Sequence, residues 1–304
     1  MGIPMKKKVI QDFSYRYSWF HLIRPLTLSG TISPILIGTL YATKKGNIEI
    51  QYFIVLLLAS LLIQIATNIF NDYFDFKQGQ DKQKWTKQQE PLRTPRHHQL
   101  PYVAIGLIVL ASFLGLWLAF RTEAWILLVG VLGILFGISY SAGQYALAAI
   151  GLGEVVAAIF LGMATTILAY VVQGNSIDWN IIFLSLPFVF LIATMILTNN
   201  IRDIKKDTGF RSTIAILIGR KWAIRILVGL LLLAYSSVIG LVLFHIVPKL
   251  ALIVLLALPC AVRLRFSFRK VPQPEIEMLG MKWAAYHHWT FGLLFALSFF
   301  ISFL

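Results

Sequence analysis

Two short runs of aspartate and asparagine interrupt an otherwise apolar sequence, and their residue types are those best suited to chemistry. The runs contain Asn68, Asn71, Asp72 and Asp75, with Asp81 shortly after, and then Asn199, Asp203 and Asp207. Residues three or four apart share one face of a helix, so each run would present its carboxylates on one side. Two such faces at one membrane surface would repel each other unless cations lay between them.

Oxygen ligands of this kind favour Mg²⁺ or Ca²⁺, and Mg²⁺ characteristically joins carboxylates to substrate phosphates. Histidine, cysteine and glutamate are absent from both runs, which argues against a zinc site. Basic residues surround both runs, and metal ions together with lysine or arginine can clamp the charge of a departing phosphate oxygen. The alternative is a pair of solvated helix ends with neutralising lysines, although carboxylates at a helix C-terminus oppose the macrodipole.

The two runs also match each other in sequence. Thr67-Asn68 recurs as Thr198-Asn199, and Asp72 recurs as Asp203, each at an offset of 131 residues. Each run closes an apolar segment. A repeat of this kind predicts two related four-helix halves, each presenting one acidic run.

The elements that must position these runs are membrane helices. The chain has 304 residues, of which 58% are hydrophobic and 13% charged, and its mean hydropathy is +0.76; a typical soluble domain carries about 25% charged residues. This excludes a soluble globular enzyme, a disordered chain and, with one cysteine, a disulfide scaffold. We expect an all-α polytopic membrane protein, a single domain over residues 1–304 with about nine helices. The expected segments are 22–43, 51–74, 100–120, 124–142, 150–172, 179–200, 222–246, 249–265 and 285–304.

The basic residues divide unevenly between the two sides of this expected bundle. With the N-terminus in the cytoplasm, 23 lysines and arginines fall in inside segments and 4 in outside segments. The positive-inside rule therefore predicts an N-in, C-out protein with both acidic runs on the cytoplasmic side. The net charge of +14 then reflects topology and an anionic lipid or substrate rather than nucleic acid.

Two further segments have an expected role in this arrangement. Residues 1–20 lack an apolar core before Tyr17 and are rich in aromatic side chains, which predicts a cytoplasmic, interfacial N-terminal segment rather than a cleaved signal peptide. Segment 124–142 contains Gly130, Gly133 and Gly137, small residues that would let neighbouring helices approach closely.

The residues resemble the UbiA superfamily of intramembrane prenyltransferases. Asn71, Asp72 and Asp75 resemble its Asn-Asp-x-x-Asp motif, and Asp203 with Asp207 resembles its Asp-x-x-x-Asp motif. Many members carry a third acid eight residues after the motif asparagine. Here that position is Gly79, and Asp81 lies two residues further on.

Accessory motifs are similar to the branch that prenylates 1,4-dihydroxy-2-naphthoate and makes demethylmenaquinone. They are the Gly-x-Asp at 79–81, Arg24-Pro25-Leu26-Thr27-Leu28, Ser139-Tyr140-Ser141 before Gly151-Leu152-Gly153-Glu154, and Asn199 to Asp203 before Arg211-Ser212-Thr213 and Gly219. The resemblance covers nearly the whole chain. The loop 83–98 is less like the family pattern.

The resemblance implies a role for each candidate residue. Catalytic aspartates holding Mg²⁺ would be Asp72, Asp75, Asp203 and Asp207, with Asp81, Asn68 and Asn71 as further ligands. Diphosphate would be bound by Asn199, Arg202, Lys205, Lys206 and Lys77. The aromatic acid would be bound by Arg24, Tyr140 and Glu154. Arg24 could equally be a juxtamembrane anchor, Tyr140 an interfacial tyrosine and Glu154 a structural hydrogen-bonding residue.

The implied reaction is transfer of a polyprenyl group from polyprenyl diphosphate to the naphthoate, with loss of CO₂ and diphosphate, at the cytoplasmic face of a bacterial cell membrane. The expected partners are these two substrates and the lipid bilayer, with no nucleic acid and no obligate protein partner. Other acceptors, such as 4-hydroxybenzoate, homogentisate or a chlorin, remain open. A cation-coupled transporter is a rival class, but a transport site should lie nearer the membrane midplane. A non-catalytic quinone- or lipid-binding protein fits the intact aspartates poorly.

Overall fold

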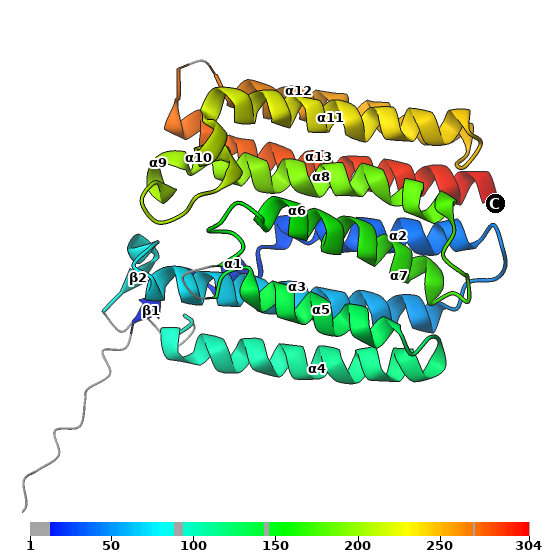
Figure 1. The fold of residues 1–304 in the computed structure, drawn as a ribbon, viewed down its shortest axis with the longest axis horizontal. Helices are drawn as coiled ribbons and strands as arrows, with labels where there is room; N and C mark the ends of the chain where they lie inside the picture. The colour runs from blue at the N-terminus through cyan, green and yellow to red at the C-terminus, as the bar shows by residue number, and fades with distance from the viewer. Residues whose placement is uncertain (1–12, 88–93, 143–145, 270, 304) are drawn as a thin grey trace, which may run out of the picture.

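Long helices lie side by side along one direction and make up most of the molecule (Figure 1). The computed structural model describes residues 13–87, 94–142, 146–269 and 271–303. The helices are α1 (Trp19–Ile23), η1 (Pro25–Thr27), α2 (Ser29–Ala42), α3 (Ile50–Lys77), η2 (Lys82–Lys84), η3 (His97–Gln99), α4 (Leu100–Arg121), α5 (Ile126–Ser139), α6 (Gly153–Ala157), the π-helical η4 (Ala158–Ala164), α7 (Thr165–Val171), α8 (Trp179–Arg202), α9 (Ile204–Asp207), α10 (Ile214–Ile218), α11 (Arg220–Leu243), η5 (Lys249–Ala257), α12 (Leu258–Ser267) and α13 (Pro274–Phe303). The strands are β1 (Ser14–Tyr15) and β2 (Trp85–Thr86).

The apolar segments expected from the sequence are all helical. Among the described residues, 7 helical segments are long and apolar enough to cross a membrane, and the bent pair Trp19–Thr27 with Ser29–Ala42 would be an eighth. The short apolar α5 fills the remaining expected segment. The all-α membrane fold is confirmed. The last helix begins at Pro274 rather than near 285, because Glu275 and Glu277 in its first turn suit the positive end of the helix dipole.

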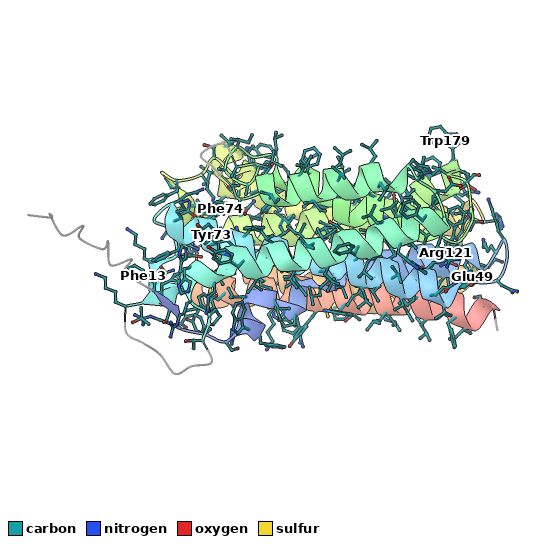
Figure 2. All side chains as sticks on the ribbon, turned by 90° about the horizontal axis from the view of Figure 1, so that it is seen from below. Phe13, Glu49, Tyr73, Phe74, Arg121 and Trp179 are labelled. Atoms are coloured by element: carbon teal, nitrogen blue, oxygen red, sulfur yellow. The ribbon has the colours of Figure 1, made fainter. Side chains whose placement is uncertain are left out.

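The two ends of the bundle differ in character. One end carries α1, both strands, α9 and α10, and the other carries the C-terminus (Figure 1). Phe13, Tyr73 and Phe74 lie at the first end, which we call the polar end; Glu49 and Trp179 lie at the other, the distal end (Figure 2). Arg121, one of the four basic residues expected in outside segments, lies at the distal end (Figure 2).

Each acidic run closes a helix that packs on the next long helix of its own half. The first run ends α3, which packs against α4, and the second ends α8, which packs against α11. Both runs reach the polar end. A buried core of α2, α8, α11, α12 and α13 side chains, including Phe188, Phe291 and Phe295, joins the second half to the last helix.

A small cap built from the N-terminal segment covers the polar end. Strand β1 pairs antiparallel with β2, with Tyr15 opposite Trp85. Both rings are 3% exposed, and Trp85 packs against Phe76 and His97. The interfacial segment expected over residues 1–20 is thus, from residue 13 onward, paired with the loop after α3; residues 1–12 lie outside the described part. The cap holds the loop that carries Lys84 over the first acidic run.

Candidate active site

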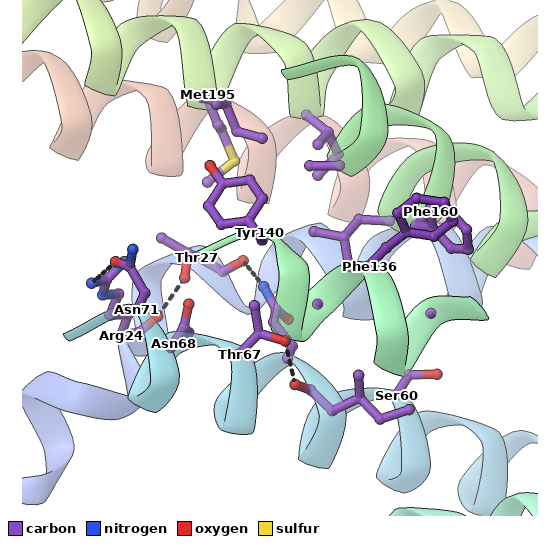
Figure 3. Close-up of a pocket in the computed structure, with 18 of the residues that line it drawn as sticks. Arg24, Thr27, Ser60, Thr67, Asn68, Asn71, Phe136, Tyr140, Phe160 and Met195 are labelled. Atoms are coloured by element: carbon purple, nitrogen blue, oxygen red, sulfur yellow. Dashed lines mark hydrogen bonds between the residues drawn. The ribbon is translucent and has the colours of Figure 1, made fainter. Parts of the chain in front are cut away.

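A large cavity of about 1270 Å³ connects the polar end to the interior of the bundle. Its polar part is lined by both acidic runs. Beyond the runs its wall becomes apolar and is built from α3, α4, α5, η4 and α7. Figure 3 shows this transition, with Arg24 and Asn71 on one side and Phe136 and Phe160 on the other. The cavity combines a charged mouth with a long apolar interior.

The cavity brings together most of the residues expected to form the site. Lining it are Arg24, Asn68, Asn71, Asp72, Asp75, Asp81, Tyr140, Asn199, Arg202, Asp203, Lys206 and Asp207. Lys77, Lys205 and Glu154 do not line it. Lys77 is exposed, with its ammonium 5.8 Å from the centre of the Tyr73 ring, and Lys205 is exposed on α9.

Asp72 is the most enclosed carboxylate of the site, with a side chain 1% exposed. It lies between two cations: Lys84 Nζ is 2.8 Å from its Oδ1, and Arg24 Nη2 is 2.8 Å from its Oδ2. Arg24 also donates to Asn71 Oδ1 at 2.6 Å, and Asn71 donates to Ser141 Oγ at 2.9 Å. A carboxylate buried this deeply stays charged only with such partners.

Arg24 reaches the acidic run because the backbone turns sharply at this residue. Its φ is 55°, in the left-handed region that non-glycine residues rarely adopt, and it separates α1 from η1. Asn68 fixes the same bend, because its side-chain amide donates to Ile23 O at 3.0 Å.

Asp81 lies where loops from the two halves meet. Lys84 Nζ is 2.7 Å from its Oδ2, and Lys206 of α9 pairs with its Oδ1. Burial alone would raise the pKa of Asp81, but the charges of Lys84 and Lys206 outweigh burial and lower that pKa to about 2. For Lys84, burial works to lower the pKa, and the carboxylates of Asp72 and Asp81 raise it overall.

Arg211 ties the second acidic run to the first. It comes from the loop after α9, and its Nη2 pairs with Asp75 of α3. Nearby, Arg202 donates to both carboxylate oxygens of Asp203, at 2.7 and 2.6 Å, and to Asn199 Oδ1 at 2.7 Å. Burial raises the pKa of Asp207, and the charge of Arg211 offsets that effect only in part.

Of the three residues expected to bind an aromatic acid, Arg24 and Tyr140 line the cavity and Glu154 does not. Tyr140 lies on the cavity wall next to the charged mouth (Figure 3), and Arg24 contacts Asn71 and Asp72 of the first acidic run. Glu154 is buried behind the wall, where it accepts a hydrogen bond from the Asn200 amide at 2.6 Å. The sequence left open that Glu154 is a structural hydrogen-bonding residue, and its contact with Asn200, beside the second motif, is of that kind.

Lys84 and Arg211 are site residues to which the sequence assigned no individual role, although both are among the basic residues around the two runs and Arg211 stands in an accessory motif. Both line the cavity, and each pairs with a motif aspartate. The available signal was weak: Lys84 follows Asp81 by three residues and Arg211 follows Asp207 by four, but the same loops are crowded with other basic residues.

The site offers oxygen ligands without a preformed metal cage. Within the described residues, no group of three or more histidine, cysteine, aspartate or glutamate side chains is placed to hold a metal ion. Instead, aspartates pair with Arg24, Lys84, Lys206 and Arg211. The donor set still fits a hard divalent cation, because carboxylates and amides from both runs face one cavity and cations already balance their charge.

Comparison with known proteins decides the family. Residues 31–286 match the UbiA prenyltransferase family. This chain belongs to the UbiA prenyltransferase family. A relative from Bacillus subtilis (strain 168), "1,4-dihydroxy-2-naphthoate octaprenyltransferase", is 31% identical over 289 residues, covering 93% of this chain and 92% of the relative.

Solved structures share the UbiA fold with this chain. The apo structure of a UbiA homolog from Aeropyrum pernix K1 has a TM-score of 0.67 at 13% identity, covering 93% of this chain and 99% of that one. A UbiA homolog from Archaeoglobus fulgidus, described as bound to DMAPP and Mg²⁺, has a TM-score of 0.61 at 15% identity, covering 92% of this chain and 100% of that one. The UbiA resemblance of the sequence motifs is confirmed.

Proposed function

We propose that this UbiA-family enzyme transfers a polyprenyl group from polyprenyl diphosphate to 1,4-dihydroxy-2-naphthoate, releasing diphosphate and CO₂ and giving demethylmenaquinone. The observation that carries the proposal is a cavity whose charged mouth is lined by both aspartate motifs and whose interior is apolar. A polyprenyl diphosphate has the same two parts, a charged head and an apolar tail. The acceptor is supported by the name of the Bacillus subtilis relative, which aligns with 93% of this chain.

Asp72, Asp75, Asp203 and Asp207 would hold Mg²⁺, with Asp81, Asn68 and Asn71 as additional oxygen ligands. When bound, Mg²⁺ neutralises diphosphate charge. The structural homologue with DMAPP and Mg²⁺ supports this assignment. The metal would take over the charge compensation that side chains such as Arg24 and Lys84 provide in this structure.

Basic residues of the mouth, together with the amide of Asn199, would bind the diphosphate itself. Arg202, Lys206 and Asn199 line the cavity, as do Lys84 and Arg211. Their cationic groups can shift from the aspartates to phosphate oxygens, because both are anionic oxygen acceptors of similar hydrogen-bonding geometry. Lys77 and Lys205 lie off the wall and would act only through the local positive potential.

Bond cleavage would occur where the charged mouth meets the apolar interior. The allylic carbon–oxygen bond of the donor breaks, its electron pair leaves with the diphosphate, and the basic residues hold that charge. The ring of Tyr140 lies at this boundary (Figure 3). Beyond it lie Phe136 and Phe160, whose ring centroids are 4.9 Å apart. Aromatic faces attract the allylic cation, and the apolar wall excludes the water that would quench it.

The ring carbon of the acceptor that bears the carboxylate would then bond to the cation, and CO₂ leaves as the aromatic ring is restored. Arg24 would hold that carboxylate. Its contacts to Asn71 and Asp72 both use Nη2, and its other nitrogens make no hydrogen bond to the described residues. A guanidinium can form two parallel hydrogen bonds to a planar carboxylate. The reaction is proposed to take place at the cytoplasmic face of a bacterial cell membrane.

The test is product mass analysis in membranes that contain the wild type, Asp72→Asn or Asp203→Asn. Wild type with a polyprenyl diphosphate, the naphthoate and Mg²⁺ should give demethylmenaquinone, and both variants should lose about a hundredfold or more in rate, the scale for removing a preorganised charge-stabilising group. Asp178→Asn, at the distal end, should retain activity. A wild type that prenylates 4-hydroxybenzoate but not the naphthoate would refute the acceptor. Undiminished turnover in either motif variant would refute the two-motif site.

A further inference from the structure

The N-terminal strand brings a tyrosine into the charged mouth of the cavity. Tyr15 of β1 lines the cavity and is 3% exposed. Tyr17 and Phe20, which also line it, are 46% and 62% exposed, as expected of aromatic side chains that anchor a segment at the membrane interface. Tyr15 is enclosed too far to be such an anchor.

The strand pairing fixes Tyr15 and Lys84 relative to each other. The Tyr15 ring meets the ring of its strand partner Trp85 edge to face, with centroids 5.0 Å apart. The N–H of Tyr15 donates to Pro95 O at 2.8 Å, and the N–H of the next residue, Arg16, donates to Lys84 O at 2.9 Å. Because these bonds join the strand to the loop after α3, the two side chains are presented to the cavity together.

The hydroxyl of Tyr15 is able to donate a hydrogen bond to a ligand. Tyr15 Oη has no hydrogen-bond partner among the described residues. Unlike Trp85 Nε1, which is fully enclosed without a partner, it keeps accessible surface, and this surface opens into the cavity that Tyr15 lines. Burial and the charge of Asp72 raise the pKa of Tyr15 to about 12, so the hydroxyl keeps its proton near neutral pH.

The groups around this hydroxyl suit an anionic ligand. The charges of Asp72, Lys84 and Arg24 all affect the pKa of Tyr15, so its hydroxyl lies among the ionised groups of the mouth. Each carboxylate oxygen of Asp72 already accepts a hydrogen bond, one from Lys84 and one from Arg24. A neutral O–H donor beside two cations therefore matches an incoming anionic oxygen, with which it would form a strong, charge-assisted hydrogen bond.

We propose that Tyr15 is a substrate-binding residue whose hydroxyl donates a hydrogen bond to the diphosphate of the prenyl donor, beside the ammonium of Lys84. The inference rests on the proposed prenyl-transfer function. The diphosphate is favoured over the carboxylate of the acceptor because the strand pairing holds Tyr15 to the loop of Lys84, whereas Arg24 comes from the bend between α1 and η1. The N-terminal segment then contributes directly to the site.

The test uses Tyr15→Phe in the full chain, with Tyr73→Phe as the matched control. Phenylalanine keeps the ring that packs against Trp85 and removes only the hydroxyl; Tyr73 packs against the same buried cluster but does not line the cavity. Calorimetry measures the binding of inorganic diphosphate with Mg²⁺ to purified protein, and KM is measured separately for geranylgeranyl diphosphate and for the naphthoate. Tyr15→Phe should weaken diphosphate binding and raise KM for the donor by about tenfold, the scale for losing a hydrogen bond to a charged group, with KM for the naphthoate unchanged. Tyr73→Phe should match the wild type.

Unchanged diphosphate binding in Tyr15→Phe would overturn the inference. A rise in KM for the naphthoate alone would also overturn it and assign the hydroxyl to the acceptor, and a change confined to the Mg²⁺ concentration needed for half-maximal binding would assign it to the metal ligands. The binding measurement separates this inference from the proposed function. A wild type that binds diphosphate about tenfold more tightly than Tyr15→Phe but forms no prenyl naphthoate would refute the proposed reaction and support the role of Tyr15, whereas a wild type that binds no diphosphate would refute both.

Discussion

Among the individual side chains of the site, charge compensation is the dominant effect. Asp72 is almost fully enclosed and has two cationic partners, and Asp81 pairs with lysines from both halves. Removing one partner of a buried pair typically costs about 3–5 kcal/mol, because the other charge is left uncompensated. Lys84 is the residue shared by Asp72 and Asp81. It therefore links the cap to both carboxylates.

Replacing Lys84 should change the pH dependence of the reaction as well as its rate. Lys84→Met removes one of the two cations that hold the pKa of Asp81 at about 2, so that pKa should rise toward its ordinary value near 4. Asp81 loses its charge as the pH falls through its pKa. If that pKa is higher in the variant, the loss of activity on the acid side of the pH–rate profile should begin at a higher pH. A pH–rate profile of Lys84→Met beside Lys82→Met, an exposed neighbour off the cavity wall, measures this. Equal profiles would contradict the role.

The aspartates could be found from the sequence, but their partners could not. Acids are rare in this chain, so two matched runs are conspicuous, and the cavity does bring them together. Lys84 and Arg211 come from loops full of lysine and arginine. The residue that meets a carboxylate there is decided by the left-handed backbone at Asp81, the strand pairing of the cap and the turn after α9. Such features depend on tertiary contacts rather than on residue spacing.

At the level of elements, the helices follow from apolar runs, whereas their contacts depend on individual small residues. The expected spans are helical, yet three neighbouring glycines in α5 have different surroundings, and only Gly137 is tightly packed. The cap strands and the early start of α13 were not expected, because both involve polar stretches whose structure is set by packing and end effects.

Gly162 in the π-helical segment should be required for packing against α8. A Cβ added there would lie 2.7 Å from Val189 N and 2.8 Å from Val189 Cα, and backbone atoms cannot move aside cheaply. Gly162→Ala should therefore destabilise the protein by about 1–3 kcal/mol through overpacking. Gly240→Ala, with no atom within 4 Å of the added Cβ, should be neutral or slightly stabilising. Thermal unfolding in detergent compares them; equal midpoints would contradict the close contact.

Across the whole molecule, the two halves pack along their length, and among the described residues the ion pairs that join the two acidic runs lie at the polar end. Asp75 comes from the first half and Arg211 from the second, while Asp81 and Lys206 repeat the same crossing. Neither half contains a complete site. The sequence predicted this division through the 131-residue repeat, but the cross-pairing depends on how the halves dock.

The orientation of the bundle is the final prediction, and it determines which compartment supplies the diphosphate. In a Cys260→Ser background, Lys82→Cys places a thiol at the exposed polar end, and Gly46→Cys places one in the exposed turn between α2 and α3 at the distal end. A membrane-impermeant maleimide should label Gly46→Cys in intact cells and Lys82→Cys only after the membrane is opened, because 23 of the 27 basic residues belong to the N-terminal side. The reverse pattern would place the charged mouth outside. Since a multiply charged diphosphate does not cross a bilayer unaided, an outward mouth would also be separated from any donor made in the cytoplasm, and the proposed reaction would then require a donor supplied from outside the cell.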